Sequence, residues 1–150
     1  DGSIKRNNDY ISKQDVRFIE AFKKDRKALW KNKTQKDAFG KAWSKETYER
    51  INVPRGYRLK HKDKYSDDAW GYIEDILDAM SLGQFRNNNL MAGHGVTYYR
   101  RSGAKETETF ANIFLLHGKR NTAAGKKAQE MFPNLFKVFD DIVNDYLRYN

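Results

Sequence analysis

The stretch Asn134–Tyr149 reads NLFKVFDDIVNDYLRY, and it decides the fold class. Its apolar residues recur at intervals of three and four, which places them on one face of a helix with a period of 3.6 residues. Six of them are expected to supply core: Phe136, Phe139, Ile142, Val143, Tyr146 and Leu147. Pro133 stands at the junction with the helix predicted before it. The stretch therefore predicts a long amphipathic helix.

Similar patterns extend upstream from this helix. A first long helix is predicted over 12–31, with an apolar stripe that includes Val16 and Phe22. Further helices are expected over about 34–50, 66–82, 105–117 and 122–131. Residues 84–104 are rich in Gly, Asn and Arg and are expected to form an ordered loop, with a short hairpin around Val96–Tyr99. The prediction is a mainly α, single domain with at most one or two short strands.

The composition fits one folded domain over residues 1–150. Only 39% of the 150 residues are hydrophobic, but nine Phe, nine Tyr and three Trp provide bulky core anchors. The absence of cysteine excludes disulfides, thiolate zinc sites and cysteine nucleophiles, so a metal site must use His and carboxylates. No apolar run approaches the ~18 residues of a membrane span. The start lacks an initiator Met, which predicts a fragment or a trimmed product.

The formal charge of +9 is unevenly distributed along the chain. Residues 1–65 hold 19 Lys/Arg against 9 Asp/Glu, a net of +10, whereas residues 66–150 hold 10 against 11, a net of −1. Such a basic half favours nucleic acid, acidic partners or an anionic surface. The candidate nucleic-acid contacts are Lys23, Lys24, Arg26, Lys27, Lys31 and Lys33. The alternative interpretation is that these side chains mostly form a solvated face.

Residue types that carry chemistry gather within 92–114. His94 lies between two glycines, which let the backbone approach closely and leave the imidazole free to bind metal or a substrate oxygen. Tyr98 and Tyr99 follow, and either phenol could stabilise an oxyanion. The structural alternatives are a histidine in a plain glycine turn, with one tyrosine in the core and the other at the surface.

Glu108 stands near the start of a predicted helix whose apolar residues seat it in a core. A carboxylate held rigidly in this way suits zinc, which binds carboxylate oxygens at about 2.0–2.2 Å. The alternative is that Glu106 and Glu108 only complement the helix dipole. His117 would lie on another face of the same helix, and neither it nor His61 is a preferred ligand.

These residues carry a resemblance to a known family. Glu108-Thr-Phe-Ala-Asn-Ile-Phe resembles the third-ligand helix of gluzincin-type zinc metallopeptidases, including the anthrax lethal factor group. The match extends to Gly93-His94-Gly95-x-x-Tyr98-Tyr99, to Phe132-Pro-Asn-Leu-Phe136 and to Asp75-Ile-Leu-Asp-Ala-Met-Ser-x-Gly83. Together, over about residues 66–147, they resemble a metallopeptidase-like domain of tailed-phage minor head proteins and related bacterial toxins.

The charge distribution divides the single domain into a basic helical half, 1–65, and a second half, 66–150, in which the resemblance implies a zincin-like, metallopeptidase-like C-terminal subdomain. The resemblance further implies a peptide or protein substrate, Glu108 as a zinc ligand, and substrate or transition-state contacts from His94 and from Tyr98 or Tyr99. The resemblance also implies that the protein is located in a phage virion or in the host cytoplasm, or that it is secreted if it is a toxin.

The sequence departs from that family in one respect. The family carries H-E-x-x-H, two zinc-binding histidines with a general-base glutamate between them, and this motif is absent from the 150 residues. Either an upstream segment supplies it, or the domain is incomplete or inactive. Two other functions remain open: a non-enzymatic, basic nucleic-acid-binding module, and, as a distant third, an ADP-ribosyltransferase in which Glu106 and Glu108 form the acidic pair.

Overall fold

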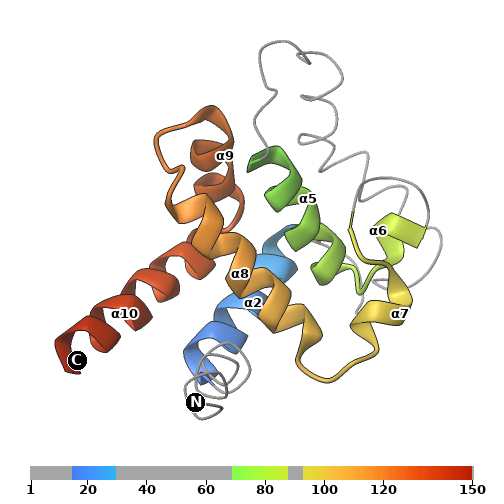
Figure 1. Cartoon of the computed structure of the whole chain (residues 1–150), viewed down its shortest axis with the longest axis horizontal. Helices are drawn as coiled ribbons and strands as arrows, with labels where there is room; N and C mark the ends of the chain where they lie inside the picture. The colour runs from blue at the N-terminus through green and yellow to red at the C-terminus, as the bar shows by residue number, and fades with distance from the viewer. Residues whose placement is uncertain (1–14, 30–68, 88–92, 150) are drawn as a thin grey trace, which may run out of the picture.

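The computed structural model describes residues 15–29, 69–87 and 93–149. Every regular element in these ranges is helical (Figure 1). The elements are α2 (Val16–Leu29), α5 (Ala69–Met80), α6 (Gln84–Asn87), α7 (Val96–Tyr99), α8 (Ala104–His117), α9 (Ala123–Met131) and α10 (Pro133–Tyr149). The predicted mainly α fold is thus confirmed, while the helix expected over 34–50 lies outside the described ranges.

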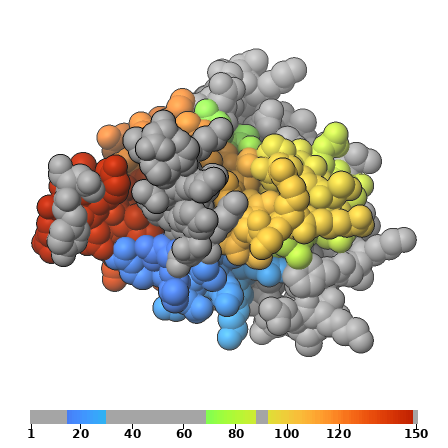
Figure 2. Space-filling view, turned by 60° about the horizontal axis from the view of Figure 1, so that its bottom comes forward, coloured from blue at the N-terminus to red at the C-terminus, as the bar shows by residue number. Residues whose placement is uncertain are grey.

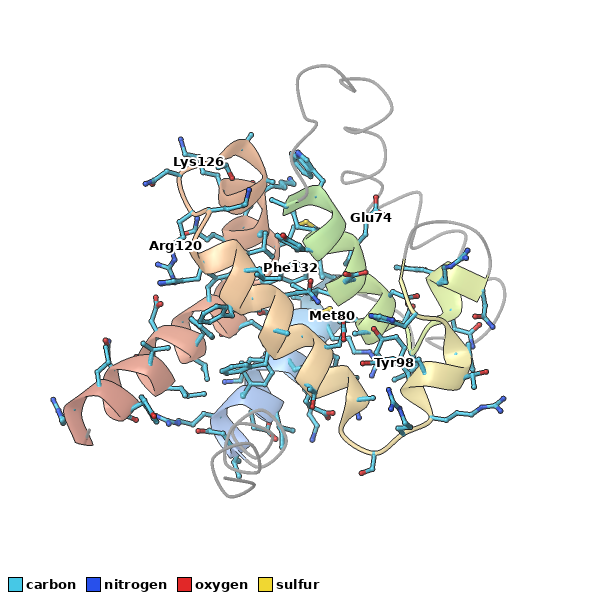
Figure 3. All side chains as sticks on the ribbon, viewed as in Figure 1. Glu74, Met80, Tyr98, Arg120, Lys126 and Phe132 are labelled. Carbon is cyan, nitrogen blue, oxygen red and sulfur yellow. The ribbon has the colours of Figure 1, made fainter. Side chains whose placement is uncertain are left out.

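Two helix pairs organise the core: α5 packs most extensively on α8, and α2 on α10. In Figure 1, α8 crosses the middle of the molecule, and Figure 3 shows Phe132, from the junction of α9 and α10, lying among the helices. The largest side chains that are fully buried, or nearly so, are aromatic: Trp70, Phe18, Phe22, Phe85, Phe132 and Phe139. These six aromatic side chains therefore form much of the core between the helix pairs.

Helix α10 is capped by a side chain from α2. The carboxylate of Asp25 is fully buried and accepts hydrogen bonds from the backbone N–H groups of Asn134 (3.2 Å) and Leu135 (2.8 Å) and from Asn134 Nδ2 (2.8 Å). The first N–H groups of a helix have no partner within it, so this carboxylate satisfies them and complements the helix dipole. Burial raises the pKa of Asp25, while these three donors act to lower it.

A left-handed turn ends α5 and reverses the chain. Leu82 has φ 53° and Gly83 has φ 83°, and the N–H of Gly83 donates to the carbonyl of Asp78 at 2.8 Å. A Cβ at Gly83 would lie only 2.0 Å from the carbonyl carbon of Gly95, so two backbone segments meet here without a side chain between them. This contact brings the segment that follows 93 against the end of α5.

The structure corrects two local predictions. Val96–Tyr99 is the short helix α7 and not a hairpin, because the N–H groups of His94, Gly95 and Val96 donate to side chains and not to a partner strand. The expected loop 84–104 also contains helix α6. In addition, Val16, Tyr146 and Leu147 are 68%, 57% and 68% exposed and do not supply core. Figures 1 and 2 show that α10 ends on the side of the molecule opposite α7.

Within the described ranges, no helix combines the length and apolarity that a bilayer crossing requires.

Candidate functional site

The carboxylate of Glu108 is the centre of a polar cluster where α8 meets α7. Its Oε1 lies 2.8 Å from His94 Nε2 and 3.3 Å from Asn112 Nδ2, and its Oε2 accepts a hydrogen bond from the Tyr98 hydroxyl at 3.1 Å. The Glu108 side chain is 18% exposed and that of His94 is 41% exposed, so solvent reaches the cluster from the histidine side. Three of the residues singled out in the sequence therefore contact one another.

Tyr98 and His94 form one face of this cluster. Their rings stack with centroids 4.2 Å apart, and the Arg101 guanidinium lies 4.5 Å from the Tyr98 ring centroid. Figure 3 shows Tyr98 between α7 and the neighbouring ends of α5 and α8. Burial and the negative charge of Glu108 raise the pKa of Tyr98, so its phenol keeps its proton and acts as a donor.

Tyr99 has a different environment from Tyr98. It is 7% exposed, it packs with Ala79 and Ala104, and its hydroxyl has no hydrogen-bond partner among the described residues. Burial and the charges of nearby carboxylates raise its pKa. The alternative in which one tyrosine is core and the other lies nearer the surface is therefore the one observed, with Tyr98 as the residue that contacts Glu108.

Asp78 of α5 holds the backbone of the His94 turn. Its Oδ2 accepts from the N–H groups of His94 (2.9 Å) and Gly95 (3.2 Å), and its Oδ1 accepts from the N–H of Arg86 (2.9 Å). The side chain is fully buried, which raises its pKa, while the three donors and the His94 charge act to lower it. Gly93 has φ 147°, and a Cβ there would lie 2.3 Å from Asp78 Oδ2. Only a glycine permits this close approach.

Asp75, one turn before Asp78, adds another carboxyl group to the site. Burial and, next, the charge of Glu108 raise its pKa to about 6, and His94 acts in the opposite direction. Sequence reasoning assigned no role to Asp75, Asp78 or Asn112. The available signal was the spacing of the two aspartates by three residues, which puts both on one face of a helix that is otherwise mostly buried.

Glu106 and His117 each pair with a residue other than Glu108, and His61 lies outside the described residues. Glu106 is 8% exposed and pairs with Lys105 Nζ at 3.0 Å. Residues two apart on a helix, such as Glu106 and Glu108, face different directions. His117, at the opposite end of α8, lies 3.5 Å from Asp140.

Four of the six candidate nucleic-acid contacts lie on α2, within the described residues. Lys23, Lys24 and Lys27 are exposed and Arg26 is half-buried, whereas Lys31 and Lys33 lie outside the described residues. Lys24 lines a groove of about 440 Å³ between α2 and α10, together with Arg17, Lys137, Glu20 and Asp141. The groove therefore contains both signs of charge.

The zinc hypothesis can be tested against these donors. A catalytic zinc site has three protein ligands and a tetrahedral arrangement. In the described ranges, no three His, Asp or Glu side chains are placed to hold a metal ion together, and both oxygens of Glu108 already have hydrogen-bond donors or an imidazole beside them. The described residues alone do not complete a zinc site.

Comparison with protein-family models, with curated proteins and with solved structures finds no match to this chain.

Proposed function

We propose that this chain is a metallopeptidase-like domain of a phage minor head protein or toxin, incomplete in its catalytic residues, with Glu108 at its centre. The observation that carries the proposal is the convergence of His94 and Tyr98 on the two oxygens of Glu108, at 2.8 and 3.1 Å. These three residues belong to two of the motifs on which the sequence resemblance rests, and they come from two separate segments of the chain.

Each residue has a chemical role in this proposal. Glu108 supplies a carboxylate on a rigid, well-packed helix, which is what an oxygen ligand of zinc requires. His94 presents an imidazole on the solvent side of Glu108, and the Tyr98 O–H, which donates to Glu108 Oε2 in this structure, could turn to the oxygen of a peptide carbonyl. The remaining zinc ligands and the general base come from residues outside the described ranges or from an upstream segment.

Metal content tests this proposal directly. If the remaining ligands lie within these 150 residues, elemental mass spectrometry of the purified chain should give about one zinc per chain, and the Glu108→Gln variant should lose it. Glu130→Gln is the matched control, because Glu130 is exposed on α9 and, in the described part of the chain, pairs with Lys127, three residues earlier. Zinc that is absent from the wild type, or retained in Glu108→Gln, would count against a zinc centre built on Glu108.

A second candidate is a basic module that binds nucleic acid, favoured by the exposed Lys23, Lys24 and Lys27 on α2. Phosphate contacts release counterions, so the affinity for single- or double-stranded DNA should fall steeply with salt and on replacement of these three lysines by Gln. Glu108→Gln should leave this affinity unchanged. Affinity that does not respond to the lysine replacements would exclude this role for α2.

A further inference from the structure

The position of His94 is poorly fixed by its own side chain. The imidazole is 41% exposed, and among the described residues it has one hydrogen-bonding neighbour, Glu108 Oε1, and ring contacts with Tyr98 and Tyr99. The glycines on both sides have positive φ, 147° for Gly93 and 85° for Gly95. Glycine is the residue with the most backbone freedom, so something outside this turn must hold it in one conformation.

The side chain of Asp78 provides that restraint from α5. One of its oxygens accepts the N–H groups of both His94 and Gly95, and the other accepts the N–H of Arg86. Hydrogen bonds from N–H groups to an ionised, buried carboxylate are stronger than neutral ones. Asp78 thereby ties the His94 turn and the start of α6 to the same point on a helix that packs on α8.

Backbone packing supports the same arrangement. Gly93 lies directly on the Asp78 carboxylate, and Gly95 lies directly on Gly83. The Asn87 side chain accepts the N–H of Val96 at 3.1 Å, which fixes the start of α7 and so the direction of Tyr98. These contacts all come from the segment 78–87, which itself contributes no side chain to the Glu108 hydrogen bonds described above.

We infer that Asp78 is a positioning residue of the site, which holds the backbone of His94 so that the imidazole lies between Tyr98 and Glu108. Its importance for chemistry rests on the proposed function, but the positioning itself does not depend on a metal or a substrate. Asp78 acts through His94 and touches no reacting group.

A second buried carboxylate offers a matched control. Asp25 is also fully buried and also accepts three N–H donors, at the junction of α2 and α10. In Asp78→Asn and in Asp25→Asn, one accepting oxygen becomes an NH₂ group that faces backbone donors. If Asp78 were only a buried hydrogen-bond acceptor like Asp25, the two variants would differ from the wild type in the same way: a similar loss of unfolding free energy in urea and no specific change at His94.

NMR spectroscopy of the purified chain distinguishes the two roles. In Asp78→Asn we expect loss of the NOEs between the His94 and Tyr98 rings and exchange of the His94 and Gly95 amides at least about tenfold faster, a factor of 10 being about 1.4 kcal/mol. In Asp25→Asn the ring NOEs and the exchange rates of these amides should match those of the wild type. Ring NOEs that persist in folded Asp78→Asn would overturn the inference.

The wild type provides a measurement that does not depend on the folding of any variant. If Asp78 holds the turn, the His94 and Gly95 amides exchange more slowly than exposed amides such as that of Ser102, and rapid exchange at both would also overturn the inference. Zinc content is measured on the same samples. Slow exchange of these two amides in a chain that contains no zinc would support the positioning role and would contradict the metal-site proposal.

Discussion

Asp25 and Asp78 show the same buried group used for two different purposes. Each carboxylate is fully buried and accepts three N–H donors. The donors of Asp25 belong to the start of α10, which is ordered along 17 residues by its own hydrogen bonds. Those of Asp78 belong to α6 and to a glycine-flanked turn. A buried carboxylate joins two helices in the first case and gives shape to an otherwise unrestrained segment in the second.

The electrostatic surroundings of the two groups also differ. The pKa of Asp25 is determined by burial and by its hydrogen bonds alone, whereas Asp78 shares its neighbourhood with Asp75, Glu108 and His94. Carboxylates gathered in this way oppose one another when ionised, and such arrangements are common at functional sites. The Asp78 region is thus expected to be the less stable of the two, and the following changes test that difference.

The largest effect is expected from Gly83→Ala. The new Cβ would lie 2.0 Å from the Gly95 carbonyl carbon, and φ at this position is 83°, so either the turn or the His94 segment must move. Overpacking together with a positive φ should cost about 3 kcal/mol of unfolding free energy in urea and should also remove the His94–Tyr98 NOEs.

Gly71→Ala is the control for that change. Gly71 lies within α5, and nothing stands within 4 Å of the added Cβ, so this variant should be more stable by about 0.5–1 kcal/mol. Equal effects of the two substitutions would show that the contact between Gly83 and Gly95 does not form.

Asp75→Asn should stabilise the protein at alkaline pH. Because the pKa of Asp75 is about 6 in the folded protein and ordinarily 3.8, folding holds its proton more tightly. The stability of the wild type therefore falls as pH rises from about 4 to about 6 and remains lower above that window. At pH 8 the variant should gain about 2 kcal/mol, with allowance for solvent screening.

Urea unfolding at pH 4 and pH 8 checks this prediction. The gain should be small at pH 4, and Asp141→Asn, an exposed change on α10, should show no gain at either pH. A gain of the same size at both pH values would mean that Asp75 is not the group that titrates.

Asn134→Ala tests the Asp25 region at a smaller scale. It removes the Nδ2 donor, 2.8 Å from Asp25 Oδ1, and leaves both backbone donors in place. We expect a loss of about 1 kcal/mol in urea unfolding, typical of one hydrogen bond to a charged group, with unchanged His94 amide exchange. Faster exchange at His94 would show that the two regions are coupled.

The smallest effect is expected from Arg17→Met. Arg17 Nη1 lies 2.6 Å from Asp145 Oδ2, but the two side chains are 47% and 48% exposed. Exposed ion pairs contribute little, so we expect a loss of less than about 1 kcal/mol, measured at low salt and reduced further at high salt. A loss as large as that of Asn134→Ala would place this pair among the determinants of α2–α10 packing.

Helical periodicity was enough to predict the described long helices. α8, α9 and α10 begin and end within a residue or two of the predicted bounds, because their apolar residues repeat over several turns. The predicted hairpin at Val96–Tyr99 was wrong, since four residues carry too little pattern to distinguish a strand from a helical turn. The conformation of this segment depends on hydrogen-bond acceptors in the side chains of Asp78 and Asn87, which lie outside the segment in sequence.

The sequence singled out the three candidate side chains that contact one another, but not the residues that support them. His94, Tyr98 and Glu108 have side chains and neighbours that indicate chemistry, and the structure brings them together. Asp75 and Asp78 lie in a mostly apolar helix, where their roles depend on which segments fold over them. A contact between a side chain and a remote backbone leaves no periodic pattern in the sequence.

The cap that Asp25 provides also bears on how this chain can be divided. The residues that carry the metallopeptidase resemblance all follow position 65, yet α10 receives its cap from a side chain 109 residues earlier than Asn134. A fragment cut at residue 66 would retain every atom of the Glu108 cluster and would expose the faces of α10 and α8 that α2 covers. Recombination or cloning that transfers the 66–150 segment alone would thus transfer the Glu108 cluster without the helix that caps α10 and packs on α10 and α8.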